Sequence, residues 1–196
     1  MEYFIWIEDE ADNALAWAMK SPREMGQKEY QLSEGVSVQA WFPQDMTFQL
    51  SDERGIRLAD AIPNIMRLMI VSQRLKDLLE QSSGARFEFF PVKIRNRKGR
   101  LEKAPYFVAN LLESVSCLDA AQSDFVPDAL AKGQVMYFKK IALDTSKIPE
   151  DAKIFRLGEK LNMFIVRKDL AQAMVNGDFT GVQFQFLEDF GKEFRS

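Results

Sequence analysis

The residues that most often carry out enzymatic chemistry are scarce in this chain of 196 residues, which has no histidine and one cysteine, Cys117. Without histidine the chain lacks the commonest general base and the commonest zinc ligand, so neither a Cys–His pair nor a Ser–His–Asp triad can form. A single cysteine also excludes a zinc ribbon or an iron–sulfur cluster bound by this chain alone. Cys117 lies in an apolar stretch, which is typical of an inert, buried thiol.

Carboxylates are the remaining candidates for catalysis, and Asp119 could pair with Asp124 or Glu113. The chain has 29 acidic residues, however, and the spacing of these three distinguishes them from no other set. The phosphate-binding patterns GxxxxGK[ST] and GxGxxG are absent. We therefore predict a protein that is not an enzyme, with no catalytic residues and no cofactor or metal.

An acidic cluster follows the first apolar residues of the chain and consists of Glu8, Asp9, Glu10 and Asp12. It precedes residues 13–19, whose composition predicts a helix, and acidic side chains are favourable beside the positive end of a helix. A solvated helix start is one interpretation of the cluster. The other is a docking patch for a basic partner.

A basic cluster surrounds a predicted hairpin turn at residues 96–99 and includes Arg97, Lys98 and Arg100. Next to the aromatic residues of the returning strand, it could bind phosphate. The alternative is a charged turn that is simply solvated and that protects a sheet edge from aggregation. Binding to nucleic acid is the less favoured hypothesis, since the net charge of the chain is −3.

These charged turns must be positioned by the regular elements, of which residues 68–91 give the clearest pattern. A short apolar run predicts a buried strand, and Ser72 then stands where it can cap a helix. Leu75 and the leucines after it repeat at helical spacing up to a stop at Gly84, and alternating phenylalanines predict a second strand. The segment predicts a strand–helix–strand unit.

The same pattern returns in residues 163–187. Arg167 stands where Ser72 stood, so the cap is missing or is moved to Asp169. The matched positions after the helix are Gly84, Phe87 and Phe89 in the first unit and Gly181, Phe184 and Phe186 in the second. Two related units indicate either an old duplication or one simple arrangement used twice.

Elsewhere the patterns predict strands at 3–7, 36–42, 46–50, 106–108, 111–119 and 134–143, and a loop at 21–35. We predict an α+β fold with mixed or antiparallel sheets and helices packed on one side. The chain forms one domain over residues 1–196, or two lobes at about 1–120 and 121–196.

The composition is that of a globular protein with no apolar run near the roughly 20 residues of a membrane helix. The N-terminus turns acidic after a few residues, unlike a secretory signal, and one cysteine suits a reducing compartment. We expect a cytoplasmic protein without membrane contact, and the 12% aromatic content leaves room for a homodimer.

Six segments carry a family resemblance: MEYFIWIEDEAD, IVSQRLKDLLE, FFPVKIRN, YFVANLLESVSCLD, SKIPEDAKIFRL and TGVQFQFL. In this order and spacing they resemble a family of bacterial immunity proteins, formerly a domain of unknown function. Members are encoded beside polymorphic toxins, either contact-dependent or type VI secreted. The resemblance implies a protein used in interbacterial competition, which binds a cognate toxin inside the producing cell and blocks it.

The residues that match this family are Ser72, Pro91, Asp119, Phe155 and Arg156. We interpret them as structural: a helix cap, a proline that ends or kinks an edge strand, and an aspartate that turns the chain. Arg156 could pair with an acid between two lobes, or be exposed in a toxin interface.

The resulting hypothesis is occlusion of a cognate toxin, and the acidic balance favours a basic toxin. The residues that we expect to contact the toxin are Glu8, Asp9, Glu10, Asp12, Arg97, Lys98 and Arg100. Specificity is expected in the loops 21–35, 95–103 and 122–133. The alternative is a small ligand-binding domain or enzyme, which a deep polar pocket with converging carboxylates would favour.

Overall fold

The computed structural model describes residues 1–191, which form three α-helices and eleven strands in mixed sheets. The helices are α1 (Gln31–Glu34), α2 (Gln73–Ser82) and α3 (Lys168–Asn176). The strands are β1 (Tyr3–Glu8), β2 (Thr47–Gln49), β3 (Met69–Ser72), β4 (Phe87–Arg95), β5 (Tyr106–Leu111), β6 (Ser114–Val115), β7 (Asp124–Pro127), β8 (Val135–Lys140), β9 (Ile154–Leu157), β10 (Lys160–Arg167) and β11 (Val182–Phe186). Short 3-10 turns are η1 (Arg23–Lys28), η2 (Thr145–Lys147) and η3 (Leu187–Asp189).

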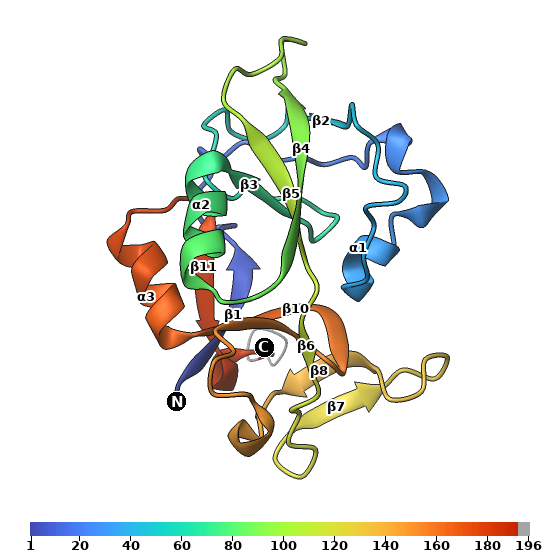
Figure 1. The fold of residues 1–196 in the computed structure, drawn as a ribbon, viewed down its shortest axis with the longest axis vertical. Helices are drawn as coiled ribbons and strands as arrows, with labels where there is room; N and C mark the ends of the chain where they lie inside the picture. The colour runs from blue at the N-terminus through green and yellow to red at the C-terminus, as the bar shows by residue number, and fades with distance from the viewer. Residues whose placement is uncertain (192–196) are drawn as a thin grey trace.

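The strands form a five-stranded sheet in the order β11-β1-β10-β9-β6, a four-stranded sheet in the order β2-β4-β5-β3, and the pair β7-β8. Most neighbours are antiparallel, while β2–β4 and β6–β9 are parallel. In Figure 1, α2 and α3 lie on the same side of the molecule. The prediction of an α+β fold with mixed sheets is therefore confirmed.

Both predicted strand–helix–strand units are present and have the same topology. The strands of the first unit, β3 and β4, flank β5, and both are antiparallel to it. The strands of the second unit, β10 and β11, flank β1 in the same way. Common ancestry of the units stays a prediction, which this shared topology supports.

The register of the two units differs from the one that the sequence predicted. Phe89 pairs with Ala109 of the central strand β5, and Phe184 pairs with Trp6 at the corresponding place on β1. Phe184 therefore corresponds to Phe89, two residues further along β4 than the predicted Phe87. The sequence comparison aligned Gly84 with Gly181. Each of these glycines belongs to its own turn, so neither fixes the register of the strand that follows it.

The helix starts of the two units agree with the prediction. The hydroxyl of Ser72 caps α2 by accepting a hydrogen bond from the backbone N–H of Leu75 at 3.2 Å. At the corresponding place in α3, Arg167 makes no side-chain cap, and the helix begins at Lys168. The apolar faces of both helices, including Leu79 and Met174, are buried in one shared core.

One prediction for the N-terminal part is wrong, because residues 13–19 form no helix. Leu15, Ala16, Trp17 and Ala18 are all buried, whereas a helix would turn some of these consecutive side chains towards solvent. The extended backbone bonds its neighbours instead: Ala16 N–H donates to the Arg57 carbonyl at 2.9 Å. Tertiary contacts have overridden helix propensity here.

Other predicted bounds need smaller corrections. The predicted loop 21–35 contains η1 and α1, and residues 36–42 form turns in place of a strand. The predicted strand 111–119 is broken, since β5 ends at Leu111 and β6 has two residues. The strands at 106–108 and 134–143 and the turn at 96–99 are present.

The N-terminal strand β1 lies between β10 and β11 in the five-stranded sheet, so the two ends of the chain share a sheet. The division into lobes at about 1–120 and 121–196 stays a prediction. Among residues 1–191, no helix is both long enough and apolar enough to span a membrane.

Candidate functional site

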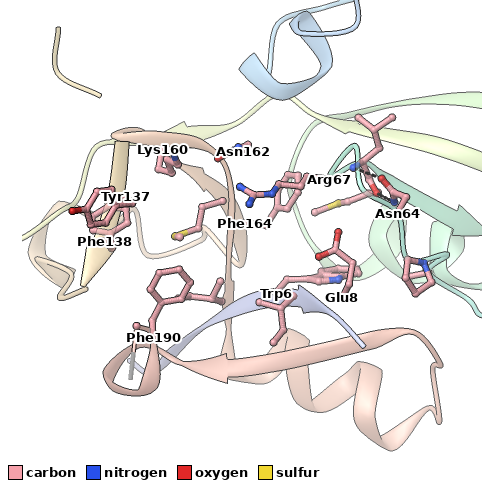
Figure 2. A pocket seen from close by; sticks show the side chains of 18 of the residues that line it. Trp6, Glu8, Asn64, Arg67, Tyr137, Phe138, Lys160, Asn162, Phe164 and Phe190 are labelled. Atoms are coloured by element: carbon pink, nitrogen blue, oxygen red, sulfur yellow. Dashed lines mark hydrogen bonds between the residues drawn. The ribbon is translucent and has the colours of Figure 1, made fainter. Parts of the chain in front are cut away.

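A cavity of about 700 Å³ opens between β1, β8, β10 and the segment that leads into β3 (Figure 2). Side chains from strands far apart in the sequence form its walls. They are Ile5, Trp6, Ile7, Glu8, Ala61, Ile62, Pro63, Asn64, Arg67, Leu68, Met69, Met136, Tyr137, Phe138, Lys139, Lys160, Asn162, Met163, Phe164, Gly181, Phe190 and Gly191. Its size lies in the range of about 300–1,000 Å³ that is usual for small-molecule sites.

The walls are mainly apolar and aromatic. Trp6 packs edge-on against Phe184 with ring centroids 6.0 Å apart, and Phe138 meets Phe190 edge-on at 6.5 Å. Phe164 is buried on β10 directly opposite Trp6 in the sheet. The contacts of Trp6 with Phe164 and Phe184 come from the pairing of β1 with β10 and β11, whereas β8 and the segment after η3 supply Phe138 and Phe190.

The charged side chains of the lining are three cations, Arg67, Lys139 and Lys160, and one carboxylate, Glu8. Burial raises the pKa of Glu8, although its own backbone N–H and the nearby Arg67 act in the opposite direction. Burial and then repulsion from Arg67 lower the pKa of Lys160. The cavity is thus a cationic site within a chain of net negative charge.

Arg67 is held by the turn that precedes β3. The buried side chain of Asn64 donates to the carbonyls of Ile62 and Leu68 at 3.0 and 2.8 Å and accepts from the Leu68 N–H at 3.0 Å. Within this closed turn Arg67 has φ +56°, a left-handed conformation that is uncommon for residues other than glycine. Figure 2 shows its guanidinium pointing into the cavity.

This arrangement is equipped for binding. Among the described residues, Glu8 is the one carboxylate that lines the cavity, so no pair of carboxylates meets there. Among residues 1–191, no group of three or more histidine, cysteine or acidic side chains could hold a metal ion. Cys117 is buried in another part of the core, where burial raises its pKa to about 12 and disfavours the thiolate.

The structure separates the members of the acidic cluster. Glu8 lines the cavity, whereas Asp12 forms an ion pair with Arg57 and accepts from the N–H of Ala14 at 2.9 Å. Asp9 accepts from the N–H of Asp12 at 3.3 Å. Since no helix follows, these aspartates cap a loop, and the interpretation as a helix start is wrong.

The basic cluster lies at the tip of the β4–β5 hairpin, at one end of the long axis of the molecule (Figure 1). Arg97, Lys98 and Arg100 are exposed there, and Asn96 closes the turn by accepting from two backbone N–H groups. The cavity is lined by other segments. The two predicted charged clusters therefore do not form one site.

The carboxylates considered for catalysis have separate roles. Asp119 closes a turn by accepting from the N–H groups of Ala121 and Gln122 at 3.0 and 3.1 Å. Glu113 forms an ion pair with Arg86 at 2.6 Å. No contact joins Asp119 to Glu113 or Asp124 among the described residues.

Two further family-matched residues are part of the strands. Phe155 is fully buried and meets the ring of Tyr3 edge-on at 5.9 Å. Pro91 does not end a strand, because β4 continues to Arg95. It pairs only with β5, since β2 joins the other side of β4 further along, at Lys93. A proline is tolerated there because no ladder needs its missing N–H.

Arg156 is buried, with an exposed fraction of 2%, so the interpretation as an exposed interface residue is wrong. Among residues 1–191 it pairs with no acid either, and burial lowers its pKa to about 10. Its guanidinium donates to the carbonyls of Leu32, Ser33, Leu111 and Leu161 and to Asn110 Oδ1, at 2.7–3.3 Å. Gly35, the left-handed C-cap of α1, leaves room for this side chain, since a Cβ there would lie 2.8 Å from Arg156 Cδ.

Most of the residues that line the cavity were not predicted from the sequence. Arg67, Lys160, Asn162 and Tyr137 come from three separate segments and carry no motif. The one local signal was Pro63–Asn64, a turn pair that directly precedes the apolar strand. Which side chains then meet across the cavity is decided by strand order, and single-residue patterns do not contain that information.

The fold and the cavity together define an α+β protein with a largely apolar cavity that carries cationic residues in its lining. A comparison with protein families gives the identity: the profile of the Immunity protein family (Imm11) matches residues 9–189. The chain belongs to this family. No curated protein matches the sequence.

Proposed function

We propose that this chain is a cytoplasmic immunity protein that binds a cognate toxin in the producing cell and neutralises it by occlusion. The observation that carries this proposal is the family match over residues 9–189. Binding is favoured over catalysis because the lining of the cavity has one carboxylate and the Cys117 thiol is buried. The toxin is therefore blocked through contact with the surface of this protein.

The β7–β8 hairpin is the surface that we propose for this contact. It is a separate two-stranded sheet at the periphery of the molecule (Figure 1). Leu130 between the two strands is 98% exposed, and Met136 and Tyr137 on β8 are exposed as well. Exposed apolar side chains of this kind mark interaction surfaces, and methionine and tyrosine are enriched in them. The hairpin overlaps the loop 122–133, where specificity was expected.

A charged contact is proposed at the tip of the β4–β5 hairpin. Arg97, Lys98 and Arg100 extend there without a structural partner for their charges among the described residues. Asp9 and Asp12 of the acidic cluster are occupied in their loop. The basic hairpin is thus better placed than the acidic cluster to steer a partner, which favours an acidic patch on the toxin.

The test is co-expression in a bacterial host with the toxin encoded beside this gene, scored by growth and by co-purification. Rescue of growth together with a stable complex is the expected result. Rescue without any complex would contradict occlusion and point to reversal of the damage. Failure to rescue would remove the immunity role towards that toxin.

A matched pair of variants tests the proposed surface. Leu130→Asp should weaken the complex at least about tenfold, because a charge then replaces an apolar contact in the interface. Val175→Asp is the control, since Val175 is also exposed, at 56%, but lies on α3. Equal affinities of the two variants would exclude the β7–β8 hairpin as the contact surface.

A further inference from the structure

We propose that the cavity between β1, β8 and β10 binds a small amphipathic anion. Such a ligand has an aromatic or aliphatic body and one carboxylate, sulfonate or phosphate group. The cavity shares Met136 and Tyr137 with the proposed toxin surface. Ligand binding is tested on the chain without the toxin, so its failure and the failure of the proposed function can be told apart.

The apolar and aromatic walls of the cavity favour a ligand with an aromatic or aliphatic body. Trp6 and Phe164 face each other as a cross-strand pair, and Met163 and Phe190 extend the apolar lining. A volume of about 700 Å³ accommodates a ligand of one or a few rings. Burying apolar ligand surface against these side chains is favourable by about 25 cal/mol per Å².

Arg67 and Lys160 in the lining favour an anionic head group on the ligand. Among the described residues, the guanidinium of Arg67 makes no hydrogen bond or ion pair, although it points into the cavity (Figure 2). Lys160 uses one N–H for the carbonyl of Met136 at 2.7 Å and retains two donors. The lining carries three cations against one carboxylate, so its charge is complementary to an anion.

The backbone of Arg67 supports a binding role. A non-glycine residue at φ +56° is strained and persists where its surroundings fix it. Here the three hydrogen bonds of Asn64 fix the turn. The guanidinium is thereby held at the cavity before a ligand arrives, which lowers the entropic cost of binding.

Two fluorescent probes of nearly the same shape test this site on the full chain. 8-Anilinonaphthalene-1-sulfonate carries the anionic group, and N-phenyl-1-naphthylamine has the same rings without it. The sulfonate probe should saturate at one molecule per chain and bind more tightly than the neutral probe. Binding without saturation, or equal affinity for both probes, would overturn the proposal.

Variants then assign the head-group contact. Arg67→Asn removes the cation but keeps a residue that tolerates the left-handed conformation. It should weaken binding of the sulfonate probe about tenfold or more and change binding of the neutral probe less than about twofold. Lys160→Gln should act in the same direction. Parallel losses for both probes would indicate a damaged cavity and would contradict an anion site.

The matched control is Arg97→Asn at the tip of the β4–β5 hairpin, which changes the net charge by the same amount away from the cavity. Its affinity for the sulfonate probe should stay within about twofold of the parent protein. A tenfold loss in this control would mean that overall charge, and not Arg67, governs binding, and the proposal would be wrong.

Discussion

Arg156 and Arg67 lie in two contrasting regions of this molecule. Arg156 is 2% exposed, and its guanidinium donates to four carbonyls and one amide oxygen. Arg67 is exposed at the cavity and, within residues 1–191, has no hydrogen-bond partner for its side chain. The guanidinium of Arg156 is bonded within the fold, whereas the fold positions the guanidinium of Arg67 at the cavity without a hydrogen bond.

The difference explains why the two arginines are expected to serve different purposes. Buried polar groups are almost always hydrogen-bonded, so the set of acceptors around Arg156 identifies a structural tie between α1, β5 and β10. A cation without internal partners on a strained backbone is available for a ligand. The following variants test this contrast.

The largest effect is expected for Arg156→Ala. The variant leaves four carbonyls and the side chain of Asn110 without this donor. The free energy of unfolding should fall by about 3–5 kcal/mol, because each buried oxygen that is left without a donor costs about 1–3 kcal/mol. Urea unfolding measures it, and a loss below about 1 kcal/mol would contradict a structural role.

The second effect is expected for Asn64→Ala, which opens the turn that carries Arg67. Loss of three buried hydrogen bonds should lower the free energy of unfolding by about 2 kcal/mol. Binding of the sulfonate probe should weaken too, because Arg67 is no longer held at the cavity. Asn176→Ala, at the exposed end of α3, is the control and should change stability by less than about 0.5 kcal/mol.

These two sites also show how far the sequence could be interpreted. The strand–helix–strand units and the cap at Ser72 were predicted because their signals are local: apolar periodicity and a hydroxyl before a helix. The environment of Arg156 was not, since its acceptors come from residues 32–33, 110–111 and 161. Every residue has a backbone carbonyl, so the residue types in the sequence do not show which carbonyls accept hydrogen bonds from Arg156.

The cavity illustrates the same limit for function. Charge runs drew attention to the acidic and basic clusters, but the structure places only Glu8 of these in the cavity lining. Arg67 and Lys160 each stand alone in the sequence and meet only because β10 and the turn before β3 face the same space. The prediction of a helix at 13–19 was wrong for a related reason, since the four consecutive residues 15–18 are all buried by tertiary contacts.

A third variant, Arg67→Asn, should affect the stability of the fold much less than the two before it. Among residues 1–191 the guanidinium makes no hydrogen bond or ion pair and interacts only at longer range with Glu8, and asparagine adopts positive φ more readily than arginine. The free energy of unfolding should stay within about 0.5 kcal/mol of the parent protein in urea unfolding. A loss of more than about 2 kcal/mol would show that Arg67 is a structural residue like Arg156.

The smallest effect is expected for Glu8→Gln and depends on pH. Burial raises the pKa of Glu8 in the folded state, so folding favours the protonated form, and this group contributes less stability as the pH rises through the raised pKa. The variant should be slightly more stable than the parent at pH 7, and the gain should vanish as the pH falls below the unfolded pKa. Urea unfolding between pH 4 and 7 measures this difference in stability, with Glu10→Gln as the control.

The Glu8→Gln variant should also bind the sulfonate probe a few times more tightly at pH 7, because a like charge has left the cavity. Weaker binding would mean that Glu8 assists the ligand and that the cavity is not selective for anions.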